Sequence, residues 1–251
     1  MITIARSKYG IPISDIFFAS GDACPDPHSA VSLFVQARSK QPGFYPFKTH
    51  IIDLSEKPHN LFSRVSSNGR YKIKRAAREG CVPSMNTMPT AHDITVFSDY
   101  FDEFARQKSL PPANRQKLSA LGAADSLFLS AVRDPSGEPL AMHAYVRDPL
   151  IRRVRLLYSA SHFRGTDDSV ARNLIGRANR LLHWHEIEQL HEQRYLQYDL
   201  GGMPVDDSDP AKNAIAQFKR EFGGQEIVEY NGYRATSLLG KTLLAIVRRR
   251  A

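Results

Sequence analysis

Cysteine is almost absent from this sequence of 251 residues. Cys24 and Cys81 are too few for a disulfide framework and too far apart for a zinc site made of cysteines. Long apolar runs are absent as well, since no stretch approaches the roughly 18 to 20 apolar residues that span a bilayer, and residues 1–5 lead into polar sequence without a signal-peptide core. We therefore expect a globular protein in the cytoplasm with no integral membrane segment.

Several enzyme motifs are also missing. The sequence has no P-loop, no dinucleotide glycine fingerprint, no Gly-x-Ser-x-Gly elbow and no zinc-protease helix. His183 and His185 are two residues apart, so on a helix they point in different directions and do not share a metal comfortably. These absences argue against hydrolases and nucleotide-driven motors, and we expect no bound metal.

Basic residues outnumber acidic ones. The sequence has 34 lysine and arginine residues against 26 aspartate and glutamate residues, which gives a net charge of +8 at pH 7. This excess would attract an anionic partner, whether nucleic acid, nucleotide, coenzyme A or a membrane surface. Many of the basic residues gather in three segments: 64–78, 147–155 and 248–250. Each segment also fits a solvated helix face or tail.

The order of apolar patterns predicts a mixed α/β or α+β fold. In the first half we expect strands at 15–20, 31–37 and 48–54, then helices at 60–80, 93–108 and 114–121, with a break in the first helix at Asn68–Gly69. In the second half we expect strands at 127–132, 140–146, 153–159, 196–200 and 226–236, with helices at about 169–191 and 210–222 and a closing helix. Turns are expected at Asp134–Gly137 and Asn231–Gly232.

The stretch from Tyr198 to Gly202 is the most informative in the sequence. A strand there ends in Asp199 and two glycines, and Gly201 and Gly202 allow a sharp turn or the close approach of a ligand because they carry no Cβ. This arrangement predicts that Asp199 lies at the lip of a cleft. The helix at 210–222 places Lys219 beside its buried stripe.

Polar residues also cluster on the predicted hairpin and on the strand after it. His143 and Tyr145 alternate with apolar neighbours, so the two side chains line one face together. A hydrogen-bonded pair on a half-exposed sheet is the alternative. The end of the next strand is crowded with further candidates: Tyr158, Ser159, His162 and Arg164. Strand ends next to helix starts are common ligand sites in α/β proteins.

Basic residues occupy the start of the helix predicted at 169–191, where they oppose the helix dipole. An anion bound near the N-terminal amides would favour Arg172 and Arg177 at these positions. Pairing with a nearby carboxylate is the alternative, with these candidates: Asp167, Asp168 and Glu186.

Four of these features together resemble the FemAB-like branch of the GNAT acyltransferase superfamily. They are the basic helix Arg70–Gly80, the hairpin segment Gly137–Ala141, the strand Tyr198–Gly202 and the helix Phe218–Gly223, which follow the family's order. The resemblance covers about residues 60 to 235. It implies a GNAT-like fold with a central mixed, mostly antiparallel sheet flanked by helices. Residues 1–59 would form a β-rich lead-in or a partial GNAT-like subdomain, and residues 60–251 the acyltransferase domain.

The resemblance implies transfer of an acyl or aminoacyl group to an amino group of a small or nucleotide-linked acceptor, for example in cell-envelope or polysaccharide synthesis. The donor would be acyl-coenzyme A or aminoacyl-tRNA. Candidate catalytic residues are Asp199, His143, Tyr145, Tyr158 and Ser159. Candidate donor-binding residues are Arg164, Arg177, Asn179, Arg180 and Lys219, the last matching the family's Phe-Lys motif. Candidate acceptor-binding residues are His162, Trp184, Tyr198, Gly201 and Gly202. We expect Asp199→Asn to fold normally and to lower turnover at least a hundredfold.

A binding protein of the same fold is the alternative to an enzyme. Such a protein would hold RNA or another anionic partner on its basic face without chemistry, and salt would weaken the complex steeply. The aromatic residues mostly follow core periodicity, so the stacking platform typical of single-strand binders is missing.

Overall fold

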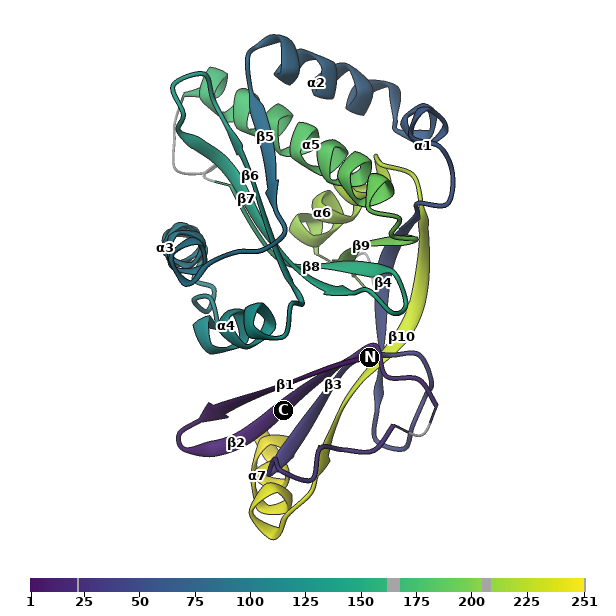
Figure 1. Ribbon diagram of the computed structural model, residues 1–251, viewed down its shortest axis with the longest axis vertical. Coiled ribbons are helices and arrows are strands. Elements are labelled where there is room, and N and C mark those ends of the chain that lie inside the picture. Colours follow the sequence, from purple (N-terminus) through teal and green to yellow (C-terminus); the bar gives the residue numbers. More distant parts are fainter. Residues whose placement is uncertain (22, 162–167, 205–208, 251) are drawn as a thin grey trace.

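The computed structural model describes residues 1–21, 23–161, 168–204 and 209–250, whose strands form one twisted sheet (Figure 1). The strands are β1 (Ile2–Lys8), β2 (Ile11–Phe17), β3 (Val31–Ala37), β4 (Tyr45–Asp53), β5 (Val82–Asn86), β6 (Leu127–Arg133), β7 (Pro139–Asp148), β8 (Arg153–Ser161), β9 (Gln197–Gly202) and β10 (Gln225–Ala235). Their order in the sheet is β1-β2-β3-β10-β4-β9-β8-β7-β6-β5. Only β2 with β3 and β8 with β9 pair in parallel, so the predicted mixed, mostly antiparallel sheet is confirmed.

Helices cover both faces of the sheet. They are α1 (Pro58–Arg64), α2 (Ser67–Arg78), α3 (Ala91–Gln107), α4 (Arg115–Ala123), α5 (Ser169–Glu192), α6 (Pro210–Arg220) and α7 (Leu238–Arg250). The long helix α5 crosses one face of β5, β6 and β7 and carries α2 on its outer side, whereas α3 and α4 pack on the opposite face (Figure 1). Helix α7 lies against β10 at the far end of the molecule. None of the described helices combines the length and apolar content needed to cross a membrane.

The apolar core is divided by the sheet. One cluster, which includes Phe128, Leu182 and Tyr198, fills the space under α5, and another, which includes Phe97 and Leu118, lies under α3 and α4. Successive residues of a strand point to opposite faces. Strand β9 lies centrally, so Tyr198 and Asp199 enter different environments although they are neighbours in sequence.

The structure corrects several local predictions. The short strands β1 and β5 were not predicted. The break in the helix at 60–80 lies at Val65–Ser66, because the Ser66 side chain caps α2 by accepting a hydrogen bond from Gly69 N. The predicted turn at Asn231–Gly232 is wrong, since β10 runs through it with a shift of register. The division at residue 59 stays a prediction, and β10 lies between β3 and β4 in the same sheet.

Candidate active site

Strands β8 and β9 run side by side over a short stretch only. Backbone pairing joins Arg153–Arg155 to Gln197–Asp199, although β8 continues to Ser161 and β9 to Gly202. Beyond this stretch the strands part, which leaves backbone polar groups in need of other partners. Gly201 lies at the parting with φ +77°, and a Cβ there would come 3.4 Å from the carbonyl oxygen of Leu156. The glycines therefore end β9 as predicted, beside a gap in the pairing that we call the β8–β9 gap.

Lys219 reaches the β8–β9 gap from α6. Its Nζ donates a hydrogen bond of 2.6 Å to the carbonyl oxygen of Gly202, and the residue is 9% exposed. Burial lowers the pKa of Lys219 to about 8, helped by the charge of Arg155 and opposed by that of Asp199. A lysine with such a pKa carries its charge at neutral pH and loses it in mildly alkaline solution, a property common at functional sites.

Asp199 lies deeper than predicted. Its side chain is 0% exposed. It accepts hydrogen bonds from Thr49 Oγ1 at 2.5 Å, Arg153 Nη2 at 2.5 Å, Gly201 N at 2.7 Å and Gln36 Nε2 at 2.8 Å. Burial alone would raise the pKa of Asp199, but the charges of Arg153 and Arg155 lower it. The position at the lip of a cleft is therefore wrong, because partners on β3, β4, β8 and β9 itself hold the carboxylate inside. Its catalytic role stays a prediction.

Gln36 joins the same buried network through a strained backbone. Its φ of 54° lies in the left-handed region, which costs a residue other than glycine about 1–3 kcal/mol. In return, its Nε2 donates to Asp199 at 2.8 Å and to Glu229 at 3.0 Å. Arg153 completes the arrangement by pairing with both carboxylates. The chain thus accepts local strain where these charged groups meet.

A separate hydrogen-bond network lies on the α5 face of the sheet, with Glu186 at its centre. The Glu186 carboxylate is fully buried, accepts from Ser130 Oγ and Tyr198 OH at 2.5 Å each, and lies 2.8 Å from His143 Nδ1. Burial alone would raise the pKa of Glu186, but the charge and hydrogen bond of His143 bring it well below its usual value. Tyr145 OH joins the network through Tyr198 OH at 2.9 Å.

His143 and Tyr145 do share one face of β7, which confirms that prediction. The alternative of a hydrogen-bonded pair is confirmed, with His143 Nδ1 3.0 Å from Tyr145 OH, but both residues are 0% exposed, so the half-exposed position is wrong. Asn179, predicted to bind the donor, lies with its Oδ1 2.9 Å from His143 Nε2. Tyr198, predicted to bind the acceptor, is 0% exposed. Their roles stay predictions, but in this structure these side chains position one another.

Three members of this network could also hold a metal. Ligand atoms of His143, His183 and Glu186 lie within 4.8 Å of one another. The His183-x-x-Glu186 spacing on one helix face is a sequence signal that the prediction of no metal overlooked. These atoms already have hydrogen-bond partners, such as Tyr198 OH at 2.6 Å from His183 Nδ1. We therefore interpret the cluster as a hydrogen-bond network, which a metal would have to break.

We expect the free energy of unfolding to decrease as the pH falls from 6.5 to 4, with His183 as one cause. Burial and the charge of His143 lower the pKa of His183 from 6.5 to about 4. Between these values the unfolded chain binds a proton that the folded chain rejects, which costs at most about 1.4 kcal/mol per pH unit. Urea unfolding at several pH values should give a shallower slope for His183→Gln. The exposed His59→Gln should keep the wild-type slope, and equal slopes for all three would contradict the assignment.

A basic hollow of about 510 Å³ lies between α2 and α5, and we call it the basic groove. Its cationic lining residues are Lys72, Arg75, Arg172, Arg177 and Arg180. Arg177 forms two hydrogen bonds with Glu79, at 2.8 and 2.9 Å, and Arg180 forms two with Glu221, at 2.7 and 2.8 Å. Glu79 was not among the carboxylates predicted to pair with Arg177. Lys72 and Arg172 form no ion pair with a described residue, so the groove stays positively charged.

The remaining candidates are dispersed. The Tyr158 hydroxyl accepts from Asn114 N at 3.2 Å and its ring packs 4.7 Å from Phe101, on the α3 face. Ser159 is half-buried and lies opposite His143 in the sheet. Trp184 is 8% exposed. Its ring packs 4.6 Å from that of Phe62, which places it in the core under α5. His162 and Arg164 lie outside the described residues.

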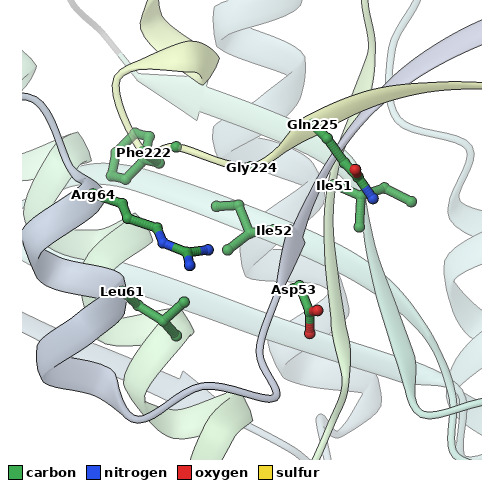
Figure 2. Close-up of a pocket in the computed structure, with 9 residues that line it drawn as sticks. Ile51, Ile52, Asp53, Leu61, Arg64, Phe222, Gly224 and Gln225 are labelled. Atoms are coloured by element: carbon green, nitrogen blue, oxygen red, sulfur yellow. The ribbon is translucent and has the colours of Figure 1, made fainter.

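A further hollow of about 450 Å³ lies where α1 and β4 meet the turn between α6 and β10 (Figure 2). Apolar side chains such as Leu61 and Phe222 share its lining with Arg64 and Asp53. Gly224 is required at its rim, because a Cβ there would come 2.5 Å from the carbonyl oxygen of Ile51. None of the predicted site residues that the structure describes lines this hollow.

No family model and no curated protein matches the sequence, but solved structures do. FemX aligns with 98% of this chain and 86% of its own, at a TM-score of 0.64 and 10% identity. The chain has the GNAT-like fold of FemX. L-PGS from Bacillus licheniformis aligns over 87% of this chain and 72% of its own, at a TM-score of 0.54 and 16% identity. The predicted FemAB-like resemblance is thus confirmed for the fold.

The C-terminal DUF2156 domain of an Agrobacterium fabrum protein, assigned as a lysylphosphatidylglycerol synthetase, is also similar. It aligns with 97% of this chain and 83% of its own, at a TM-score of 0.55 and 14% identity. The FemX-like fold therefore includes the N-terminal strands, because all three alignments extend well beyond residues 60 to 235.

Proposed function

We propose that the protein transfers an acyl or aminoacyl group from an anionic donor to an amino group. The parting of β8 and β9 beside Lys219, in a chain with the fold of FemX, is the observation on which this proposal rests. The amine nitrogen would bond to the donor carbonyl carbon while the bond to coenzyme A sulfur or to a tRNA ribose oxygen breaks. The amine's proton would pass to that leaving group. The acceptor would be a small or nucleotide-linked amine, as in cell-envelope synthesis.

The polar residues divide into those that would touch a substrate and those that would position others. The ammonium of Lys219 would stabilise negative charge on the donor at the β8–β9 gap, and the half-buried Ser159 would offer a hydroxyl. Asp199 would act as a positioning residue, because it accepts from Gly201 N at 2.7 Å. The basic groove, with Arg177 and Arg180, would hold the donor's phosphates. His143 and Tyr145 would support this arrangement from the core.

Donor binding gives the direct test. Acyl-coenzyme A, free coenzyme A or aminoacyl-tRNA at about a hundred times its dissociation constant should add roughly 2.7 kcal/mol to the stability of the folded protein. The thermal unfolding midpoint should then rise by several degrees. Arg172→Ala removes a groove cation that pairs with no described carboxylate and should weaken the shift, whereas Lys241→Ala on α7 should not. A chain that binds none of these donors would contradict the proposal.

Activity should decline above about pH 8 if the Lys219 ammonium takes part. The pKa of Lys219 is about 8, and above it the side chain loses the charge that stabilises the donor. Lys219→Arg keeps a charge at higher pH and should move the alkaline limb of the rate profile upward. Lys219→Ala should lower the rate on the order of a hundredfold. Rates of donor consumption measured from pH 6 to 10 test this, and an alkaline limb shared by wild type and Lys219→Arg would rule it out.

The basic groove also favours a second candidate, a protein that binds RNA or another polyanion without chemistry. Such binding should weaken by orders of magnitude as salt is raised, in proportion to the phosphates contacted. It should also be indifferent to Lys219→Ala, because Lys219 is not among the residues that line the groove. Donor turnover that depends on Lys219 would decide for the transferase.

A further inference from the structure

Buried charges on the sheet face opposite α5 form one connected cluster. Asp15 accepts from Arg6 at 2.9 Å and pairs with Lys117 at 3.0 Å. Lys117 and Arg155 lie close enough for the charge of Arg155 to contribute to a lowered pKa of Lys117, whose main cause is burial. Arg155 in turn interacts with Asp199, which pairs with Arg153 and through it with Glu229. Lys219 interacts with the charges of Asp199 and Arg155 and belongs to the same group, which we call the charge cluster.

The charge cluster is not balanced within the described residues. Its acidic members are Asp15, Asp199 and Glu229, and its basic members are Arg6, Lys117, Arg153, Arg155 and Lys219. Five cations therefore face three carboxylates, an excess of two positive charges. The Asp15, Asp199 and Arg153 side chains are at most 1% exposed, and those of Arg6 and Lys117 are 11% and 15% exposed, so water offsets only part of this excess. Buried unbalanced charge is costly and calls for a counter-charge.

Arg155 is the basic member of the charge cluster with the fewest polar partners among the described residues. Its Nε is buried without a hydrogen-bond partner among the described residues, and its guanidinium carbon lies 5.8 Å from the centre of the Phe47 ring. No described carboxylate forms an ion pair with it, although Asp199 lies near. Arg155 itself is only half-buried, so part of the residue is open to solvent. A guanidinium in such a place is well suited to bind a carboxylate or phosphate in a fork.

We propose that the charge cluster is an oxyanion-binding subsite, with Arg155 as its direct ligand for a carboxylate or phosphate group. If the chain is an acyltransferase, as proposed above, the acceptor is then an acid: an amine that also carries a carboxylate or phosphate. The subsite lies on the face opposite α5, whereas the basic groove lies between α2 and α5. A donor in the groove and an acidic acceptor at Arg155 would approach the β8–β9 gap from different sides.

Anion titration of the ligand-free protein tests this inference without any donor. Sodium phosphate and sodium malonate should each be tried against sodium chloride of matched ionic strength, with thermal unfolding and calorimetry as readouts. At least one of the two oxyanions should give a saturable shift that chloride does not. A larger response to malonate would indicate a carboxylate acceptor, and a larger response to phosphate would indicate a phosphorylated one.

Arg155→Met should weaken this binding at least tenfold and, with no anion present, should unfold at a higher temperature than wild type. The stability gain follows because one uncompensated buried charge has been removed. Lys241→Met makes the same charge change on α7, far from β8, and should behave as wild type (Figure 1). Equal shifts in wild type and Arg155→Met, or no saturable shift with either oxyanion, would overturn the proposal. Donor binding in the basic groove would be unaffected by that failure, so the two proposals can fail separately.

Discussion

Glu186→Ala is expected to lower the free energy of unfolding by about 3–5 kcal/mol, a large part of the 5–15 kcal/mol that a typical domain possesses. Glu186 is 0% exposed and accepts hydrogen bonds from Ser130 and Tyr198. Its carboxylate also pairs with His143 and His183. Alanine would leave these donors buried without an acceptor, and such groups lose their full hydration without compensation. It would also leave a cavity between α5 and the sheet.

The measurement is urea unfolding of Glu186→Ala beside two controls. Glu186→Gln keeps the volume and one carbonyl oxygen, so its loss of stability should be intermediate. Glu192→Ala removes an exposed carboxylate near the end of the same helix, where Gln189 donates to it at 3.0 Å, and should cost less than about 0.5 kcal/mol. A similar small loss for Glu186→Ala and Glu192→Ala would mean that the network does not hold α5 on the sheet.

Local chemistry explains which elements could be predicted from the sequence. The hairpin of β6 and β7 depends on the turn at Asp134–Gly137, where Asp134 Oδ1 accepts from Ser136 N at 2.9 Å and Glu138 N at 3.0 Å. Helix α5 begins at a side-chain cap on Asp168, whose Oδ1 accepts from Val170 N at 2.8 Å. These signals involve residues close in sequence, so they can be read without knowledge of the fold.

Other features depend on residues far apart in the chain. Asn231–Gly232 is a strong turn signal, yet β10 continues through it because β3 and β4 pair with it on both sides. A Cβ at Gly232 would come 2.1 Å from the Phe44 ring, so packing and not a turn requires this glycine. The short edge strands β1 and β5 give weak patterns. Propensity is overridden by tertiary contacts in each case.

Only part of the candidate site could be predicted, because some of its contacts are local in sequence and others join distant residues. His143, Tyr145 and Lys219 follow from strand and helix periodicity. The positions of Arg153, Gln36 and Glu229 could not be predicted in this way. Arg153 and Gln36 contact Asp199 from 46 and 163 positions away in the sequence, and Glu229 joins the group by pairing with Arg153. A guanidinium in a basic segment looks like a solvated residue until the fold places a carboxylate beside it. Burial of Arg153, which is 1% exposed, is therefore a property of the sheet order and not of its neighbours in sequence.

Asp199→Asn is expected to lower the free energy of unfolding by about 3–5 kcal/mol. This replaces the expectation from the sequence that the variant folds normally. Asparagine has nearly the same shape, but it removes the negative charge that pairs with Arg153 and leaves that guanidinium with Glu229 alone. The substitution also changes the acceptor that fixes Gly201 N beside the β8–β9 gap. Turnover per folded molecule should therefore still fall about a hundredfold, through misplaced glycines and not through a lost base.

Unfolding in urea and activity at a temperature where the variant is fully folded separate these two effects. Asp99→Asn breaks an exposed pair with Arg115 and should cost less than about 1 kcal/mol. The double variant Asp199→Asn with Arg153→Met should lose less unfolding free energy than the two single variants lose together, because the uncompensated guanidinium is gone. Additive losses would mean that the Asp199–Arg153 pair is not the cause. Full stability with lost turnover would restore Asp199 as a group that acts on the substrate, since a carboxylate that merely holds the fold cannot be removed without cost to the fold.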